Sequence, residues 1–302
     1  MNSNDNAMEA NTLTITYLTR ASFASLNGSD KEADNISNIK KIQMADGLEY
    51  PYRSAQAIRR DLREQLAALG EDLSEGMKSE ISKGASSTAG NPQKYIDDDL
   101  FGFMIADKIT KKRTSPVRVS PLISLEPYRG ELDFATNFMG VKAGGDPNIF
   151  ESEIHSGCYR GTILIELDRI GEKEIGGNYE LKLNNGEKKR RVSSLLDAIQ
   201  NLWGIGRQSR FLADISPKFV VAGLLKVKNP IFLECLRMGN NGVVDEKLIK
   251  STLDDFSSIV IDSVLGERKG FFPKDTEEAL PIGQAFAKMK GWLDNIKGYN
   301  EE

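Results

Sequence analysis

Apolar and polar residues alternate with two different periods near the start of the chain. In residues 13–17 apolar side chains alternate with threonine, which is typical of a half-buried strand. In residues 54–69 they recur at the 3.6-residue spacing of a helix, and Pro51 and Ser54 suit its start. One face of this helix is apolar and consists of Ala55, Ile58, Leu62, Leu66 and Leu69. The opposite face is basic and consists of Arg53, Gln56, Arg60 and Arg63.

The basic face of this helix allows two interpretations. A helix that begins at Ser54 directs free backbone N–H groups and the positive end of its dipole to the side of Arg53, which suits a phosphate group. The alternative is an ordinary amphipathic helix with solvated arginines. The helix alone favours this alternative, because charged outer faces are common.

Later segments predict further elements. A long hairpin spans about residues 135–153, because Gly144-Gly145-Asp146-Pro147 is a strong turn signal, and it projects from the body. The other predicted elements are a short hairpin within 42–50, strands at 161–168 and 218–227, a helix from Arg191 to Trp203 and, from about residue 245, two amphipathic helices with a loop at 266–275.

The order of these elements predicts an α+β fold with a ferredoxin-like or RRM-like core, in which two helices cover one side of an antiparallel sheet. Residues 70–133 are polar at first and later rich in proline, which indicates an insertion on the core and forbids a long helix across residues 116–127. We expect this insertion to be a mainly helical subdomain. The predicted organisation is a disordered leader (1–11), the core with its hairpin (12–69 and 134–240), the insertion (70–133) and a C-terminal helical part of the same domain (241–302).

Composition narrows the class of protein. The 302 residues are 39% hydrophobic and 28% charged, and no run of about 18 apolar residues suggests a membrane span. The polar N-terminus lacks the apolar segment of a signal peptide, so we expect a cytoplasmic protein. Cys158 and Cys235 are isolated from each other, which argues against a zinc site or a disulfide scaffold.

The distribution of charge is more informative than the net charge of −4. Acidic residues concentrate at 97–99 and in the C-terminal quarter of the chain. Basic residues bunch instead at 53–63, 108–113, 188–191 and 207–210. A basic groove on an acidic body has this pattern.

Several residues suggest chemistry but fit structural roles better. His155 is the only histidine and has no evident nucleophile beside it, so we expect no catalytic role. The aspartates at 97–99 point in different directions and suit a helix N-terminus better than a metal ion. Phe101, Phe103 and Trp203 are expected in the core.

The first strand, the loop with Asn27-Gly28 and residues 35–42, and the segment Tyr52-Arg53-Ser54-Ala55-Gln56-Ala57-Ile58-Arg59 together resemble one known family. They are similar to the DevR-type backbone subunit of type I CRISPR surveillance complexes (Cascade). This is the Cas-seven family of the RAMP superfamily, and the likeness is to its I-B branch. The resemblance is most specific over residues 13–63, moderate over 134–227 and weak elsewhere.

This resemblance implies a modified RRM with a thumb hairpin. Several copies would stack along a guide RNA, each thumb folding over the RNA of its neighbour and kinking one nucleotide outward. The implied partners are guide RNA, target DNA paired to it, further copies of the chain and other Cascade subunits, with no membrane. The implied role is not enzymatic and needs no cofactor or metal.

The resemblance also implies contact residues. A thumb side chain at Phe138 or Met139 would wedge between bases, and Lys111, Lys112 and Arg113 would touch the target strand. A subunit that accepts any guide should hold phosphate and sugar and leave base edges free. The expected guide-RNA contacts are Arg20, Asn38, Lys40, Lys41, Arg53, Ser54, Gln56, Arg59, Arg60, Arg63, Phe138, Met139, Lys142, Arg207, Gln208 and Arg210.

Two alternatives remain open at this point. Related type III backbone subunits cut RNA with an aspartate in the loop after the first strand, where this chain has Asp30 and Asp34, so a metal-dependent ribonuclease is one alternative. The other is a stand-alone RRM-like protein that binds cellular RNA.

Overall fold

The structure is a computed structural model that describes residues 9–28, 36–78, 86–106, 110–139, 144–145, 148–204, 208–239 and 241–300. The helices of the described chain are α1 (Ala55–Ala68), α2 (Ile96–Phe101), α3 (Asn185–Gln200), α4 (Gln208–Phe211), α5 (Glu246–Asp255) and α6 (Ile282–Trp292). The strands are β1 (Thr12–Ala24), β2 (Ile36–Ser37), β3 (Lys41–Gln43), β4 (Glu49–Arg53), β5 (Met77–Lys78), β6 (Ser86–Ser87), β7 (Phe103–Ile105), β8 (Lys111–Arg113), β9 (Val117–Val119), β10 (Leu122–Ser124), β11 (Glu131–Asn137), β12 (Asn148–Glu166), β13 (Phe219–Leu225), β14 (Val260–Glu267) and β15 (Leu280–Pro281).

One large sheet organises the molecule, in the order β15-β14-β13-β1-β12-β10-β4-β3. Its centre is antiparallel: β1 pairs with β12 and β13, and β12 pairs with β9 and β10. The sheet is mixed, because β15 pairs with β14 in parallel at its edge. The predicted α+β class is confirmed.

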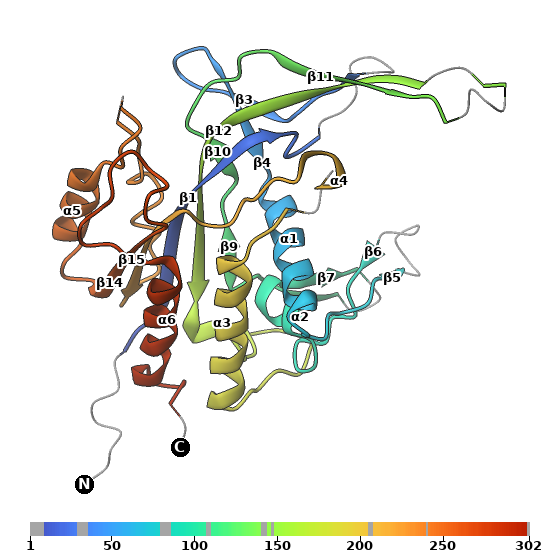
Figure 1. The fold of residues 1–302 in the computed structure, drawn as a ribbon. Coiled ribbons are helices and arrows are strands. Elements are labelled where there is room, and N and C mark those ends of the chain that lie inside the picture. Colours follow the sequence, from blue (N-terminus) through green and yellow to red (C-terminus); the bar gives the residue numbers. More distant parts are fainter. Residues whose placement is uncertain are drawn as a thin grey trace, which may run out of the picture.

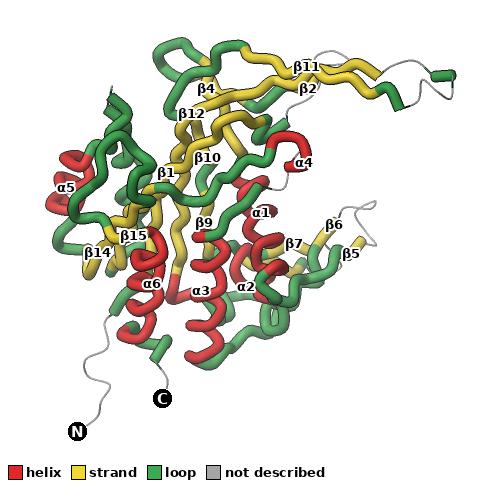
Figure 2. Tube along the Cα trace, viewed as in Figure 1, coloured by secondary structure: helices red, strands yellow, loops and turns green. Residues whose placement is uncertain are grey.

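One face of the sheet is covered by α6, α3 and α1, which lie side by side across it (Figure 2). Leu13, Ile15 and Tyr17 of β1 point to this side because alternate residues of a strand share a face. They join the main core with Ile58, Leu62 and Leu66 of α1 and with the apolar face of α3. The predicted strand and helix therefore meet in one core.

The opposite face of the sheet has a second core. Leu18 of β1 packs there with Phe219 and Val221 of β13 and with Phe232 and Leu236 from the segment after β13. Strand β1 is consequently buried on both faces over residues 12–19. A strand of this kind needs apolar or small polar residues on each side, which explains the threonines between its apolar residues.

The predicted projecting hairpin is present as β11 and the first part of β12, paired from Glu131 with Ile154 to Asn137 with Asn148. It extends away from the body in Figure 1. Strand β12 continues without interruption into the centre of the large sheet, so the hairpin and the sheet share one strand. The hairpin and the strand at 161–168 were predicted as separate elements, and their continuity was not predicted.

Two predicted subdomains differ from the structure. The described part of residues 70–133 is mainly short strands with the six-residue helix α2, and not mainly helical. Its last strands, β9 and β10, belong to the large sheet. The C-terminal part likewise contributes a strand, β14, which pairs with β13. Short strands with irregular spacing leave little periodic signal in the sequence.

Smaller differences concern boundaries and exposure. Residues 1–8 of the predicted leader lie outside the described residues, but Ala10 is buried and Asn11 bonds Leu225. Leu69 and Trp203, expected on apolar faces, are 48% and 47% exposed because each lies just beyond its helix. Phe101 and Phe103 are buried as predicted. Within the described residues, every helix is too short or too polar to cross a bilayer.

Candidate nucleic-acid interface

The N-terminus of α1 presents polar groups to solvent. The Ser54 hydroxyl caps the helix by accepting a hydrogen bond from the Ala57 N–H at 3.3 Å. Gln56 is exposed, and the side chain of Arg60 is 73% exposed with only a surface ion pair to Glu64 at 3.4 Å. These groups can meet an anion without leaving any partner buried and unpaired.

Two further arginines of α1 are partly engaged by the body. Arg59 is half-buried and donates to the Val117 carbonyl at 3.4 Å. Arg63 lies beside the buried Asp97 carboxylate at 3.3 Å and over the Phe101 ring at 4.7 Å. Both side chains therefore help to attach α1 to the insertion.

Arg53 is not on the basic surface, which corrects the prediction for this side chain. It is 6% exposed, and its guanidinium donates to both oxygens of Asp61 at 2.6 and 2.7 Å. A third bond goes to the Leu26 carbonyl. Since Asp61 is also fully buried, the pair is an internal tie between β4, α1 and the end of β1. The guanidinium has no surface to offer a phosphate.

Residues 38–41 connect the base of the hairpin to β3. Asn38 is buried and Lys40 is half-buried. The Lys41 ammonium contacts Glu153 of β12 at 2.8 Å and lies 4.3 Å from the Tyr128 ring centroid. The structure thus brings Lys40 and Lys41 near the hairpin, with Lys41 already neutralised by a carboxylate.

The end of the hairpin is apolar and exposed. Phe138 is 60% exposed and Met139 is 88% exposed. Lys142 lies outside the described residues. Large apolar side chains with this exposure are costly in a free monomer unless another molecule covers them.

Helix α4 lies between the hairpin and the start of α1 (Figure 1). Its Arg210 bonds Asp133 of β11 at 2.5 Å and Ser152 of β12 at 3.2 Å. The same guanidinium stands 4.7 Å from the Phe150 ring centroid and 5.0 Å from that of Phe211. Arg207 lies outside the described residues, and so does the side chain of Gln208.

The remaining predicted contacts lie apart from this surface. Arg20 points to the same face of the sheet as Leu18, away from α1, and lines a cavity of about 280 Å³ with Glu126, Arg129 and His155. Within the small hairpin β7–β8, Lys111 and Lys112 are exposed at its edge. The structure therefore gathers only part of the predicted set into one place.

Arg113 is the second residue for which the structure corrects the predicted contact. It is 3% exposed, and its guanidinium bonds the buried Asp99 carboxylate at 2.5 Å and the Glu172 carbonyl at 2.9 Å. Asp99 also accepts from Arg191 of α3 at 2.9 Å. Burial raises the pKa of Asp99, although both arginines oppose that change. This network fastens the insertion to α3 and leaves Arg113 unavailable to a target strand.

The described residues that were considered for catalysis or metal binding are buried or bonded within the protein. His155 is 4% exposed with Nδ1 at 2.8 Å from the Tyr159 hydroxyl. Cys158 and Cys235 are buried free thiols, and burial raises the pKa of each to about 12. The described residues contain no group of three metal-ligating side chains. Asp30 and Asp34 lie outside the described residues.

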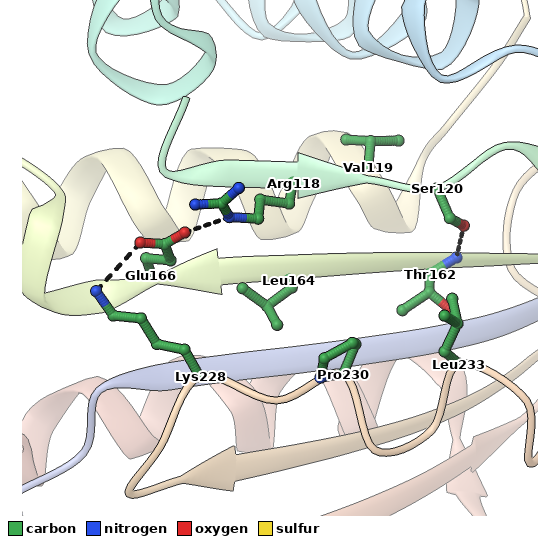
Figure 3. Close-up of a pocket in the computed structure, with 9 residues that line it drawn as sticks. All are labelled: Arg118, Val119, Ser120, Thr162, Leu164, Glu166, Lys228, Pro230 and Leu233. Carbon is green, nitrogen blue, oxygen red and sulfur yellow. Dashed lines mark hydrogen bonds and ion pairs between the residues drawn. The ribbon is translucent and has the colours of Figure 1, made fainter. Parts of the chain in front are cut away.

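A cavity of about 400 Å³ lies on the sheet face away from α1 (Figure 3). Leu164, Pro230 and Leu233 line its apolar part, and Glu166 closes one end with Arg118 and Lys228. Burial alone would raise the pKa of Glu166, but hydrogen bonds from Arg118, Arg169 and Lys228 lower it. The charged side chains of this cavity are paired with one another, so the cavity differs from the open surface at α1.

Three aromatic residues that lie close to Arg210 were not among the predicted contacts. They are Phe23 of β1, Phe150 of β12 and Phe211 of α4. Phe23 is 49% exposed, and its ring centroid is 5.7 Å from that of Phe211. Only the adjacency of Arg210 and Phe211 hints at them in the sequence, because the other two come from distant strands.

Comparisons with known proteins agree on one family. Residues 15–248 match the family described as "CRISPR-associated negative auto-regulator DevR/Csa2". A relative from Myxococcus xanthus (strain DK1622), "CRISPR-associated protein Cas7/Cst2/DevR", is 26% identical over 223 residues, or 66% of this chain and 67% of that protein.

Solved structures show the same fold. A chain of a "CRISPR RNA-guided surveillance complex, pre-nicking" aligns with a TM-score of 0.61 at 13% identity, covering 93% of this chain and 99% of that one. A chain of a second "CRISPR RNA-guided surveillance complex" aligns with a TM-score of 0.57 at 15% identity, covering 93% and 98%. Because the family match spans most of the sequence, this chain belongs to the CRISPR-associated DevR/Csa2 family.

Proposed function

We propose that this chain is a non-catalytic backbone subunit of a type I CRISPR surveillance complex, in its I-B form, and that several copies polymerise along a guide RNA in the cytoplasm. The observation that carries the proposal is the projecting hairpin with Phe138 and Met139 exposed at its end. A hairpin that is anchored in the central sheet by β12, and whose described residues Phe138 and Met139 are exposed, is suited to contact a neighbouring copy and its RNA.

The polar side chains near the N-terminus of α1 are the second feature that supports the proposal. Ser54, Gln56, Arg59 and Arg60 offer hydroxyl, amide and guanidinium groups that bind phosphate and sugar. These contacts do not read base edges, so the guide stays free to pair with target DNA. Lys40 and Arg210 flank the same path on the hairpin side, and Lys111 and Lys112 remain candidates for the displaced or target strand.

Co-expression with a CRISPR array and its neighbouring subunits tests this function. We expect the purified chain to retain guide-length RNA in a particle much larger than its 33.4 kDa mass. The double variant Gln56→Glu/Arg60→Glu should lose most of that RNA. Lys250→Glu is the matched control, because Lys250 is also an exposed cation in a surface ion pair, to Glu278 at 2.9 Å, but lies on α5.

Other results would point to other functions. A monomer without RNA, or one that retains a single preferred cellular sequence, would overturn the backbone proposal. Cleavage of the bound RNA on addition of Mg²⁺ or Mn²⁺, abolished by Asp30→Ala or Asp34→Ala, would contradict the non-catalytic role.

A further inference from the structure

Four planar side chains lie in a row of contacts between the hairpin and the end of β1, called the column below, with the Phe23 and Phe211 rings tilted by 49° to each other. The Phe23 ring lies 5.7 Å from Phe211, the Arg210 guanidinium is 5.0 Å from Phe211, and the Phe150 ring is 4.7 Å from that guanidinium. The column thus runs from β1 through α4 to β12. It joins three segments that are far apart in the sequence.

The inner part of the column is held in place. Arg210 is fixed by Asp133 and Ser152, so its guanidinium stays between the two phenyl rings. Leu212, directly after Phe211, has a positive φ of 45°, which is unfavourable for a non-glycine residue and persists only where surrounding structure imposes it. The ring of Phe211 is therefore presented from a constrained end of α4.

The outer end of the column is open. Phe23 is 49% exposed, and it stands on the strand end that follows a register irregularity between Ala21 and Ala24. A half-exposed phenylalanine at the end of this column presents aromatic surface that another molecule can contact. Such a surface can accept a nucleobase, since every base has a π-face that stacks regardless of sequence.

The chain that follows Phe23 is tied to the start of α1. Three residues after Phe23, the Leu26 carbonyl accepts a hydrogen bond from Arg53, which directly precedes the N-cap Ser54. A single-stranded RNA whose phosphates meet Ser54, Gln56 and Arg60 would bring its bases toward Phe23.

We propose that Phe23 and Phe211, backed by Arg210 and Phe150, form a base-stacking platform for single-stranded RNA. This inference rests on the proposed function and adds a binding subsite to it. In this arrangement α1 binds phosphates through charge, and the platform binds a base through stacking. Neither contact requires a particular base.

Binding of a short fluorescent oligouridylate to the full-length chain tests the platform. Phe23→Leu keeps an apolar contact with Phe211 but removes the aromatic face, so we expect the Kd to rise about tenfold. The slope of log K against log salt should not change, because no phosphate contact is lost. Phe256→Leu, a half-buried phenylalanine at the end of α5, is the matched control and should bind like the wild type.

A second readout covers the case in which Phe23→Leu affects folding. Irradiation of wild-type protein bound to an oligouridylate containing 5-iodouridine should crosslink Phe23 or Phe211, and mass spectrometry should locate the crosslink. A Kd for Phe23→Leu within twofold of the wild type, or crosslinks only at other residues, would overturn the platform. If the wild type binds no RNA at all, the proposed function fails instead.

Discussion

Individual residues show how charge is divided between the interior and the surface of this protein. Arg53 and Arg113 belong to basic runs in the sequence, yet each is buried against an aspartate. Arg60 and Lys112 belong to the same runs and are exposed. A run of basic residues therefore identifies the region of an interface but not the side chains that reach it.

Removing one partner of the buried Arg53–Asp61 pair should destabilise the fold strongly. We expect Asp61→Ala to lower the free energy of unfolding by about 3–5 kcal/mol, because it leaves a buried guanidinium without its carboxylate. Urea denaturation measures the change. Glu64→Ala, which removes only the exposed partner of Arg60, should cost less than about 1 kcal/mol. Equal effects of the two variants would contradict the buried role of Arg53.

His155 should make stability depend on pH in the acidic range. Burial lowers the pKa of this imidazole below the value of about 6.5 that is usual for histidine. The unfolded chain therefore binds a proton more readily than the folded one, and stability falls as the pH drops below about 6.5. His155→Gln should lose less stability than the wild type between about pH 7.5 and pH 5.5 in urea denaturation. An identical pH dependence in both proteins would show that His155 is not responsible.

Among the elements, the hairpin and the insertion differ in how they are attached. The hairpin is an extension of the central strand β12. The insertion is fastened by side chains, through Asp99 with Arg113 and Arg191 and through Arg63 with Asp97. The base of the hairpin is also tied to the body, by Lys41 with Glu153 and Arg210 with Asp133, so only the residues beyond the β11–β12 ladder can be removed without breaking these contacts.

The end of the hairpin can be removed as a test of its role. Asn137 and Asn148 are opposite residues in the ladder, so replacing residues 138–147 with Asn-Gly closes the hairpin with a two-residue turn. We expect the thermal unfolding midpoint to stay close to that of the wild type, because the described residues of the removed segment, among them Phe138 and Met139, belong to neither core. Assembly on guide RNA should be lost, as measured by particle size. Unchanged assembly would exclude the tip from contacts between copies.

The whole molecule combines a net charge of −4 with a local basic surface. Binding to RNA should therefore weaken steeply as salt increases, despite the acidic total, because phosphate contacts release counterions. We expect Arg60→Gln to reduce the magnitude of the slope of log K against log salt by about 0.7, the value for one contact to a single strand. Titrations at several salt concentrations measure it. A slope unaffected by Arg60→Gln would place the phosphates elsewhere.

Much of the fold could be predicted because its main elements carry strong local patterns. The alternation in β1, the apolar stripe and N-cap of α1, and the glycine-rich turn of the hairpin each specify a conformation within a few residues. The short strands of the insertion and β14 could not be predicted in this way. Their stability comes from pairing with strands distant in the chain, as β14 pairs with β13.

The candidate site, like the fold, could be predicted only where it depends on local sequence patterns. The sequence by itself determined the class of fold, the basic helix and the exposed hairpin, since periodicity, capping and turn chemistry act between near neighbours. Only the tertiary structure decided that Arg53 and Arg113 are internal and that Phe23, Phe150 and Phe211 meet at Arg210. Burial and ion pairing depend on which distant segments the sheet brings together, and no local pattern encodes that choice.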